Sequence, residues 1–510
     1  MNQARLFVGS CFALISTAVC FAVIGAIMGA LKGQFVLSNE QVGYIGGAAI
    51  WGFTLSIFAL GPLVDALGMR NLLRFALLCH LIGPLLMIFA SGEAAYWMLF
   101  SGALILSLGN GTVEAVCNPL IATIYPDQKT KKLNQFHVWF PGGIVIGGVS
   151  CYVLDKLVGD IASVQHWQLK LALILVPTIV YGILFTGQRF PATERVQSGV
   201  TFGGMVRGAL LRPLFLILLA CMCITASLEL GPGRWVPAVL EAGGIAGILV
   251  LAYINGLMAI LRFFAGPVVH RLSPTGILVC SAILAGIGLY WFSFAETTVM
   301  AFVSATLFAV GVCYFWPTML GVVSERVPRS GALGLALMGG MGMLIVGVVA
   351  APQMGRVADG YLHEELQTQR MQETVTALGH AVESYPPLAA DEDETIRTEI
   401  LSAVGKAQEV LDETTATGQL PAGKTADALR STIANSPKDE MAQVIKGELE
   451  GVLNPADNYG GRMSFRYVAP FSIVIIIVFG IIYLRDRAGG GYKAEKLTAG
   501  GMEPPRDMDS

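Results

Sequence analysis

Long apolar runs alternate with short polar segments along most of the chain. Twelve of these runs are long enough to cross the ~30 Å hydrocarbon core of a bilayer as helices. They cover residues 6–31, 42–65, 70–90, 94–125, 134–157, 167–187, 209–232, 245–270, 276–295, 299–323, 331–357 and 464–485. The pattern predicts an all-α membrane protein with twelve transmembrane helices.

A polar stretch, residues 358–463, interrupts this pattern between the eleventh and twelfth runs. Between Asp359 and Arg462 it holds 19 acidic and 8 basic residues. Pro386-Pro387 and Pro421 divide the stretch, and apolar residues recur in it at helical spacing, at Ile396, Ile400, Ala403, Ala407 and Leu411. It is therefore expected to be an acidic insert of three or four short amphipathic helices.

The composition narrows the class of protein further. The chain is 54% hydrophobic and 14% charged, whereas a soluble domain is about one-quarter charged, which excludes an ordinary soluble enzyme. Basic residues are scattered in short loops and form no face for nucleic acid. All nine cysteines lie in apolar segments, so no disulfide framework is expected.

The distribution of lysine and arginine predicts the orientation. These residues are abundant in alternate short loops, at positions such as Arg70, Lys129 and Arg326, and sparse in the others, at Lys32, Lys156 and Arg234. Basic loops stay on the cytoplasmic side of a membrane. Both termini are therefore expected in the cytoplasm and the insert outside, in a plasma membrane (in bacteria, the inner membrane).

Two halves of the chain repeat each other. The segment Gly61-Pro62-Leu63-Val64-Asp65 reappears 205 positions later as Gly266-Pro267-Val268-Val269-His270, and two further pairs, Asn118-Pro119 with Trp316-Pro317 and Gly142-Gly143 with Gly339-Gly340, have offsets of 198 and 197. This predicts two pseudo-symmetric six-helix bundles. Their expected limits are 1–187 for the first and 209–357 with 464–486 for the second, with a cytoplasmic linker at 188–208, the insert at 358–463 and a cytoplasmic tail at 487–510.

A polar stripe marks the fourth helix. Asn110, Glu114 and Asn118 recur every four residues and must face the bundle interior, since an ionised group at the bilayer centre costs about 2.5–3.5 kcal/mol. At ~1.5 Å per residue, Glu114 lies roughly 16 Å deep. Because burial disfavours the charged form of a carboxyl, Glu114 is a candidate proton-coupling group; the alternative is a structural hydrogen bond between helices.

Further polar and aromatic residues offer the chemistry of a sugar site. His137 and Trp139 open the fifth helix, where an aromatic plane can stack on a sugar ring and an imidazole can bind its hydroxyls. For His137, a packed core role and a proton relay stay open. The second half offers similar groups at Glu229, Trp235, Tyr253, Asn255 and Trp316.

Gly231-Pro232-Gly233 should break the seventh helix, and broken helices mark gates and sites in transporters. Other features have a structural interpretation: Trp235 could be an anchor at the membrane interface instead of a binding residue. Arg262 should snorkel toward the cytoplasm or pair with a carboxylate, and His80 should be a packed core residue. The run from Gly418 to Thr425 fits a phosphate-loop pattern, but no buried strand precedes it, so nucleotide binding is rejected.

Gly61, Asp65, Gly68 and Arg70, between the second and third helices, match the loop signature of the major facilitator superfamily, which the membrane part of the chain resembles. Asp65 and Arg70 can pin a tight cytoplasmic turn that Gly68 permits, so the four residues form a candidate cytoplasmic gate motif. The resemblance implies two bundles that rock around a central site.

A narrower resemblance is to the fucose–proton symporter family of sugar transporters. It lies in Glu114 with Asn118-Pro119, Leu133-Asn134, Glu229 with Trp235, and Phe315-Trp316-Pro317-Thr318. The family implies proton-driven hexose uptake, with Glu114 as a substrate or proton site. The family's best-known members also carry an aspartate in the first helix as the proton site, where this chain has no ionisable residue. Coupling through Glu114 or Glu229, sodium coupling and uncoupled transport therefore stay open.

These patterns together indicate a transporter and not an enzyme. The expected function is proton-coupled symport of a monosaccharide by alternating access, by a monomer in the lipid bilayer. A proton or sodium gradient drives it without a cofactor. The alternatives are a sodium-coupled or facilitative carrier of another polar metabolite, and a sensor or docking protein on a transporter scaffold, with the insert binding an extracytoplasmic partner.

Overall fold

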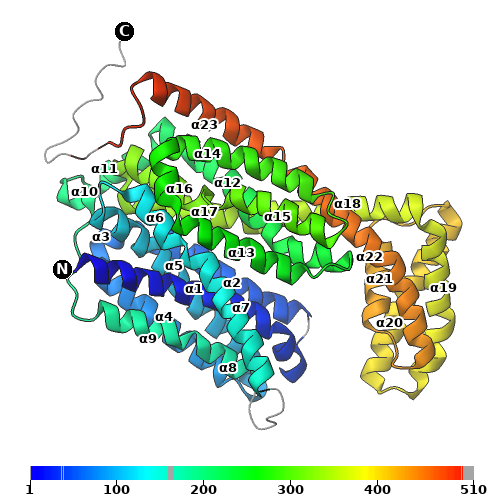
Figure 1. Cartoon of the computed structure of the whole chain (residues 1–510). Coiled ribbons are helices and arrows are strands. Elements are labelled where there is room, and N and C mark those ends of the chain that lie inside the picture. Colours follow the sequence, from blue (N-terminus) through cyan, green and yellow to red (C-terminus); the bar gives the residue numbers. More distant parts are fainter. Residues whose placement is uncertain (1, 36, 38, 159–165, 496, 498–510) are drawn as a thin grey trace.

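The computed structural model describes residues 2–35, 37, 39–158, 166–495 and 497. In that part of the chain every regular element is a helix, and the elements form a long bundle with a helical lobe at one end (Figure 1). The all-α prediction is confirmed for these residues.

The N-terminal half contains the first six predicted spans. Its elements are α1 (Gln3–Phe35), α2 (Asn39–Leu60), α3 (Val64–Leu67), α4 (Met69–Ile88), η1 (Gly92–Ala94), α5 (Ala95–Ile124), α6 (Lys129–His137), α7 (Trp139–Val158), α8 (His166–Leu173) and α9 (Leu175–Phe185). The fifth predicted span is divided between α6 and α7, and the sixth between α8 and α9.

The linker and the C-terminal half follow. The linker holds α10 (Glu194–Gln197) and α11 (Phe202–Leu210), whose first turns are capped by the hydroxyls of Thr193 and Thr201. The membrane elements of the C-terminal half are α12 (Pro213–Ala242), α13 (Gly247–Phe263), α14 (Ala265–Phe292), α15 (Thr298–Val312), α16 (Phe315–Arg326), η2 (Pro328–Ser330), α17 (Gly331–Ile345), η3 (Val346–Ala350), the start of α18 (Ala351–Gln369), the end of α22 (Glu440–Val468) and α23 (Phe471–Ala488).

Eleven helical stretches among the described residues are long and apolar enough to cross a membrane. The eighth predicted span corresponds to α13, a shorter apolar helix of 17 residues, followed by the first two turns of α14. A multi-pass membrane protein is thus established, and the twelfth crossing is a proposal.

The seventh helix is not broken at Gly231-Pro232-Gly233, so that prediction was wrong. Helix α12 continues through Pro232 and Pro237 to Ala242. Pro232 and Gly231 are buried against neighbouring helices, and Met354 of α18 packs beside Gly231. Tertiary packing supports a proline-containing membrane helix that local propensity alone would interrupt.

The internal repeat extends to the backbone conformation of one residue. Gly68, which separates α3 from α4, has φ 80° and ψ 136°. Ser273, 205 positions later, has φ 60° and ψ 159° and marks a kink within α14. Ser273 is the only residue other than glycine with positive φ in the described part of the chain. The turn that follows the second helix is therefore duplicated after the eighth.

The insert forms a lobe at one end of the bundle (Figure 1). Helix α18 continues from the bundle into it, α19 (Met371–Leu388), η4 (Ala389–Asp391), α20 (Glu394–Thr417) and α21 (Lys424–Ala434) complete it, and α22 leads back. It has its own apolar core, which includes Leu366, Tyr385 and Leu449. The insert is thus a folded helical unit joined to the bundle by two continuous helices.

The predicted stripe along residues 396–411 is mostly confirmed. Ile400, Ala403 and Ala407 are buried, whereas Ile396 at the first turn is 38% exposed. Pro421 lies between α20 and α21, and Pro386-Pro387 occupies the last turn of α19.

The phosphate-loop pattern lies between two helices. Gly418 ends α20 and Gly423 precedes α21. Lys424 Nζ contacts Glu409 Oε1 at 2.9 Å and Glu413 Oε2 at 2.8 Å, and these hydrogen bonds raise the pKa of the exposed lysine. A helix in place of the strand and a lysine paired with carboxylates both argue against phosphate binding at this loop.

The bundle has two distinct ends. The beginning of α1, the linker helices α10 and α11, and the end of α23 lie away from the insert (Figure 1). We call this the linker end and the opposite one the insert end.

Candidate functional site

Three polar side chains of the N-terminal half meet inside the bundle. Asn118 Nδ2 donates to Glu114 Oε2 at 2.6 Å along α5, and His137 Nε2 of α6 lies 3.0 Å from Asn118 Oδ1. His137 Nε2 is also 4.0 Å from Glu114 Oε2. All three residues are buried. Glu114, Asn118 and His137, each a candidate from the sequence, therefore form one hydrogen-bonded cluster.

The C-terminal half contributes an ion pair to the same region. Arg262 Nη2 of α13 donates to Glu229 Oε1 of α12 at 2.7 Å, and Arg262 Nε donates to the backbone carbonyl of Cys313. Arg262 is 2% exposed and Glu229 is 8% exposed. Of the alternatives expected for Arg262, pairing with a carboxylate is the one that the structure shows.

Arg262 also connects the two halves directly. Its Nη1 donates to the backbone carbonyl of His137 at 3.1 Å. One guanidinium thus binds a carboxylate of the C-terminal half and the backbone beside the Glu114 cluster. We call Glu114, Asn118, His137, Glu229 and Arg262 the central cluster.

One polar atom in this cluster has no partner. Glu229 Oε2 is buried without a hydrogen bond among the described residues. An unsatisfied buried carboxylate oxygen is costly, so it is a natural acceptor for a hydroxyl or other donor on a bound solute.

Asn110 belongs to a different group of side chains. Its Oδ1 lies 2.9 Å from His80 Nε2, and His80 Nδ1 is 3.1 Å from the Tyr181 hydroxyl and 3.3 Å from Ser16 Oγ. His80 is fully buried, in agreement with its predicted core position. The polar stripe on α5 therefore divides, with Asn110 held inside the N-terminal half and Glu114 and Asn118 at its junction with the other half.

Among the predicted tryptophans, Trp316 lies beside the central cluster, with its backbone next to Glu229. Trp316 is 8% exposed and packs over Gly342 of α17, while Trp139 is half-buried beside the core of the N-terminal half. Trp235 packs against Gly355 of α18.

Two other predicted site residues make contacts away from the central cluster. Tyr253 is 38% exposed, and its hydroxyl lies 2.8 Å from Thr306 Oγ1. Asn255 Nδ2 donates to the carbonyl of Leu251 on its own helix.

The candidate gate motif is tied to the linker. Asp65 accepts hydrogen bonds from Thr193 Oγ1 at 2.6 Å and from Arg195 Nε at 2.7 Å. Arg70 donates to the backbone carbonyl of Gln188. Both charges thus hold the turn against the linker, Asp65 at the start of α10 and Arg70 at Gln188.

Gly61 has a separate role in this motif. A Cβ atom at its position would lie 2.1 Å from Ala336 Cβ of α17. Only a glycine allows the end of α2 to approach the other half this closely.

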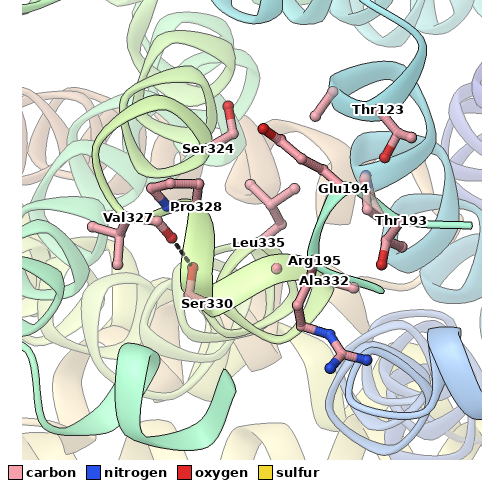
Figure 2. Close-up of a pocket in the computed structure, with 13 residues that line it drawn as sticks. Thr123, Thr193, Glu194, Arg195, Ser324, Val327, Pro328, Ser330, Ala332 and Leu335 are labelled. Carbon is pink, nitrogen blue, oxygen red and sulfur yellow. Dashed lines mark hydrogen bonds between the residues drawn. The ribbon is translucent and has the colours of Figure 1, made fainter. Parts of the chain in front are cut away.

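Further contacts hold the two halves together at the linker end. Lys129 Nζ binds Glu194 Oε2 and the carbonyl of Ser324, and Thr130 donates to Glu325 Oε1 through its backbone N–H at 2.9 Å and its hydroxyl at 2.8 Å. Figure 2 shows a cavity here, lined by Thr193, Glu194 and Arg195 of the linker and by residues of both halves. Its volume of about 30 Å³ suits a water molecule and excludes an organic solute. The linker end is therefore closed.

Sequence reasoning named the ion pair of Arg262 only as one option and did not identify Lys129, Thr130 or Glu325 as joining the halves. An arginine within an apolar run is a readable signal, because such a charge needs a partner. The contacts at the linker end depend on which helix ends meet across the two halves, and the local sequence does not encode that.

Two apolar helical halves that enclose a buried polar cluster at their junction define a membrane carrier. The chain belongs to the Major Facilitator Superfamily, whose family model matches residues 7–351. Proteins of this superfamily are transporters that bind small-molecule solutes within the membrane.

One curated relative is the gentisate transporter of Corynebacterium glutamicum. It is 23% identical over 346 residues, which cover 65% of this chain and 76% of the relative. Two solved structures share the fold at lower sequence identity than this relative.

The fucose:proton symporter FucP of E. coli, in its outward conformation, has a TM-score of 0.57 at 19% identity, covering 69% of this chain and 92% of FucP. The proton:xylose symporter XylE, bound to 6-bromo-6-deoxy-D-glucose, has a TM-score of 0.57 at 14% identity, covering 71% of this chain and 90% of XylE. At these identities the likeness concerns the fold.

Proposed function

We propose that this protein is a secondary active transporter that moves a monosaccharide together with protons by alternating access. The observation that carries the proposal is the central cluster, in which Glu114 and Glu229 lie on opposite sides of the junction between the halves and Arg262 spans it. A solute bound at such a junction contacts both halves, so its binding can favour one arrangement of the halves over another.

Glu114 is the proposed proton carrier. Its carboxylate accepts a hydrogen bond from the neutral amide of Asn118, whereas Glu229 is bound by the guanidinium of Arg262. An amide can hydrogen-bond to a carboxyl in either protonation state, while a buried guanidinium favours the ionised form. Glu114 can therefore exchange a proton during the cycle while Glu229 remains the counter-ion of Arg262.

The substrate proposal rests on the groups around the junction. Asn118, His137 and the free oxygen of Glu229 can accept or donate hydrogen bonds to hydroxyls, and Trp316, whose backbone lies beside Glu229, is an aromatic residue close to the junction. FucP and XylE, which share the fold, are sugar:proton symporters by name. Both points favour a monosaccharide.

A second candidate is a small solute that bears a carboxylate. Arg262 is a buried cation at the junction, and guanidinium groups bind carboxylates through paired hydrogen bonds. The curated relative named as a gentisate transporter supports this alternative. Such a carrier could use a sodium gradient or none at all.

The orientation is part of the proposal. We place the linker end, both chain termini and the closed gate in the cytoplasm, and the insert outside a plasma membrane. Basic residues at the linker end, among them Arg70, Lys129 and Arg326, support this placement. The conformation described here would then be closed to the cytoplasm.

Uptake into proteoliposomes tests the function. Purified protein is reconstituted, and pH and sodium gradients are imposed separately with radiolabelled hexoses and with aromatic carboxylates. The proposal expects accumulation of a hexose with an inward proton gradient and none with sodium alone. Accumulation of carboxylates only would select the second candidate, and accumulation of neither class would refute both.

A third possibility is that the insert makes the protein a sensor or docking protein. The insert has its own core, and α22 is tied to the bundle by Asn458 Nδ2, which donates to the carbonyl of Val239 at 2.7 Å. Replacing residues 367–450 with a short Gly-Ser linker removes most of the lobe and keeps this tie. Unchanged uptake together with loss of a copurifying partner would favour docking, and loss of folding would indicate a brace.

A further inference from the structure

The segment that follows α23 folds back onto the end of α16. Gly490 and Gly491, with φ of 85° and 105°, reverse the chain, and Gly491 N donates to the carbonyl of Asp486 at 2.8 Å. Positive φ values of this kind are readily adopted by glycine. The turn places Tyr492 over Arg326, whose guanidinium carbon lies 4.4 Å from the centre of the tyrosine ring.

This segment is held by specific polar contacts. The Tyr492 hydroxyl donates to Glu325 Oε2 at 2.8 Å, and Glu495 N donates to the Glu325 carbonyl at 2.7 Å. The carboxylate of Glu495 receives two hydrogen bonds from Arg212, at the start of α12. We call residues 489–495 the C-terminal clasp.

Glu325 is shared between the clasp and the other half of the protein. Its Oε2 accepts from Tyr492, while its Oε1 accepts twice from Thr130 of α6. The side chain is 8% exposed, and α6 and α16 approach so closely that a Cβ on Gly321 would lie 2.3 Å from Thr130 Oγ1. A buried carboxylate with donors on both oxygens has a fixed orientation. Losing one set of donors would free it to turn.

We propose that the C-terminal clasp is a regulatory element that positions Glu325 for its contact with Thr130 and so favours the conformation closed at the linker end. Tyr492 and Glu495 are positioning residues that act through Glu325. The inference rests on the proposed function only in that the two halves separate at this end during transport.

The clasp makes the closed state dependent on a segment outside the two bundles. Its partners are Glu325 and Arg326 at the end of α16 and Arg212 at the start of α12, so it braces two helix ends of the C-terminal half. Displacing the segment would weaken the closed gate without touching the central cluster.

Accessibility of a buried cysteine at the gate tests this inference. Ala332 is 1% exposed and lines the cavity at the linker end, so a cysteine in its place reacts with a membrane-impermeant maleimide only when the halves separate. Cys223 and Cys280 are changed to serine first, because they are the two cysteines that are not buried and could react with the maleimide. The other seven cysteines are buried and are kept. The full-length protein is labelled in nanodiscs without solute or gradient.

Tyr492→Phe removes one hydroxyl and keeps the ring. Because it deletes a hydrogen bond to a buried charge, we expect the labelling rate to rise roughly tenfold. Glu495→Gln should raise it too, and Thr130→Val should raise it without adding to the effect of Tyr492→Phe, since both act through Glu325. Lys493→Ala, an exposed position on the same segment, is the matched control and should leave the rate unchanged.

Equal labelling rates in the unaltered protein, in Tyr492→Phe and in a chain truncated after Arg487 would overturn the inference. Thermal unfolding of each variant verifies that it is folded, and the mild Tyr492→Phe change keeps the test valid if truncation is not tolerated. Labelling needs no transported solute. A protein that fails to transport sugar but responds to Tyr492→Phe would therefore refute the proposed function and leave the clasp standing.

Discussion

Arg262 and His137 lie on opposite halves of the protein and are joined by a hydrogen bond of 3.1 Å from the guanidinium to the backbone carbonyl. The imidazole of the same histidine contacts Asn118, which in turn binds Glu114. The ion pair of the C-terminal half is thus two side chains away from the proposed proton carrier. A change in charge at Glu114 therefore occurs next to the contact that joins the halves.

Glu114→Gln should separate proton coupling from solute binding. The amide keeps the size of the side chain and a hydrogen-bonding group beside Asn118 but cannot exchange a proton. We expect loss of accumulation driven by a pH gradient, while solute exchange at equal pH stays within about threefold of the unaltered protein, because most binding contacts remain. Uptake and counterflow in proteoliposomes measure the two activities. Full pH-driven accumulation by the variant would exclude Glu114 as the coupling group.

The Arg262–Glu229 pair should be costly to break from one side. Arg262→Gln leaves Glu229 as an unpaired buried charge, a change that costs about 3–5 kcal/mol in other proteins. The double variant Arg262→Gln with Glu229→Gln removes both charges and should recover most of that loss. Thermal unfolding in detergent compares the three proteins. If the double variant were no more stable than Arg262→Gln, the unpaired charge of Glu229 would not be the cause of the loss of stability.

Much of the membrane architecture could be predicted from the sequence, because an apolar run of about twenty residues has few alternatives to a membrane helix. The proximity of Glu114 and Asn118 was also predictable, since a spacing of four residues places two side chains on one face of a helix. The seventh helix was mispredicted at Pro232, where packing against α18 outweighs local propensity.

The remaining contacts depend on which segments meet in three dimensions. Nothing near Thr130 in the sequence points to Glu325, and nothing near Glu325 points to Tyr492, because the distances along the chain are 195 and 167 residues. The same reason explains why Asn110 was grouped with Glu114, although His80 holds it elsewhere.

The clasp should be insensitive to pH in the range where transport is measured. Burial and the neighbouring Glu325 carboxylate raise the pKa of Tyr492 well above its ordinary value. A raised pKa means that the folded protein favours the protonated phenol, so the contact is complete below about pH 10 and is lost only at higher pH. The increase in labelling caused by Tyr492→Phe should therefore be the same at about pH 6 and pH 9. An effect confined to one end of this range would show that another group controls the clasp.

Gly61→Ala should weaken the contact between α2 and α17. The added methyl group would lie 2.1 Å from Ala336 Cβ and 2.7 Å from the Ile57 carbonyl, so the halves must move apart. Overpacking of this kind costs about 1–3 kcal/mol. Adding Ala336→Gly removes the nearest atom and should restore part of the stability, although the same change in the unaltered protein should destabilise it. Thermal unfolding of the four proteins gives the coupling energy between the two substitutions. If their effects on stability simply add, residues 61 and 336 do not contact each other.

Replacing Ser273 with glycine and replacing Gly68 with alanine should change the stability of the protein in opposite directions. Ser273 has a φ of 60° and a ψ of 159°, a conformation that costs side-chain-bearing residues about 1–3 kcal/mol. Ser273→Gly should relieve this strain and raise the stability by about 1 kcal/mol, after subtracting the weak hydrogen bond of 3.3 Å from Gly276 N to Ser273 Oγ. Gly68→Ala, at φ 80°, should lower the stability by a similar amount. Thermal unfolding of both variants tests the pair, and Ser273→Ala is the matched control, because it removes the hydroxyl but keeps the strain. Stabilisation by Ser273→Ala equal to that by Ser273→Gly would mean that the hydroxyl, and not the backbone conformation, limits the stability of this turn.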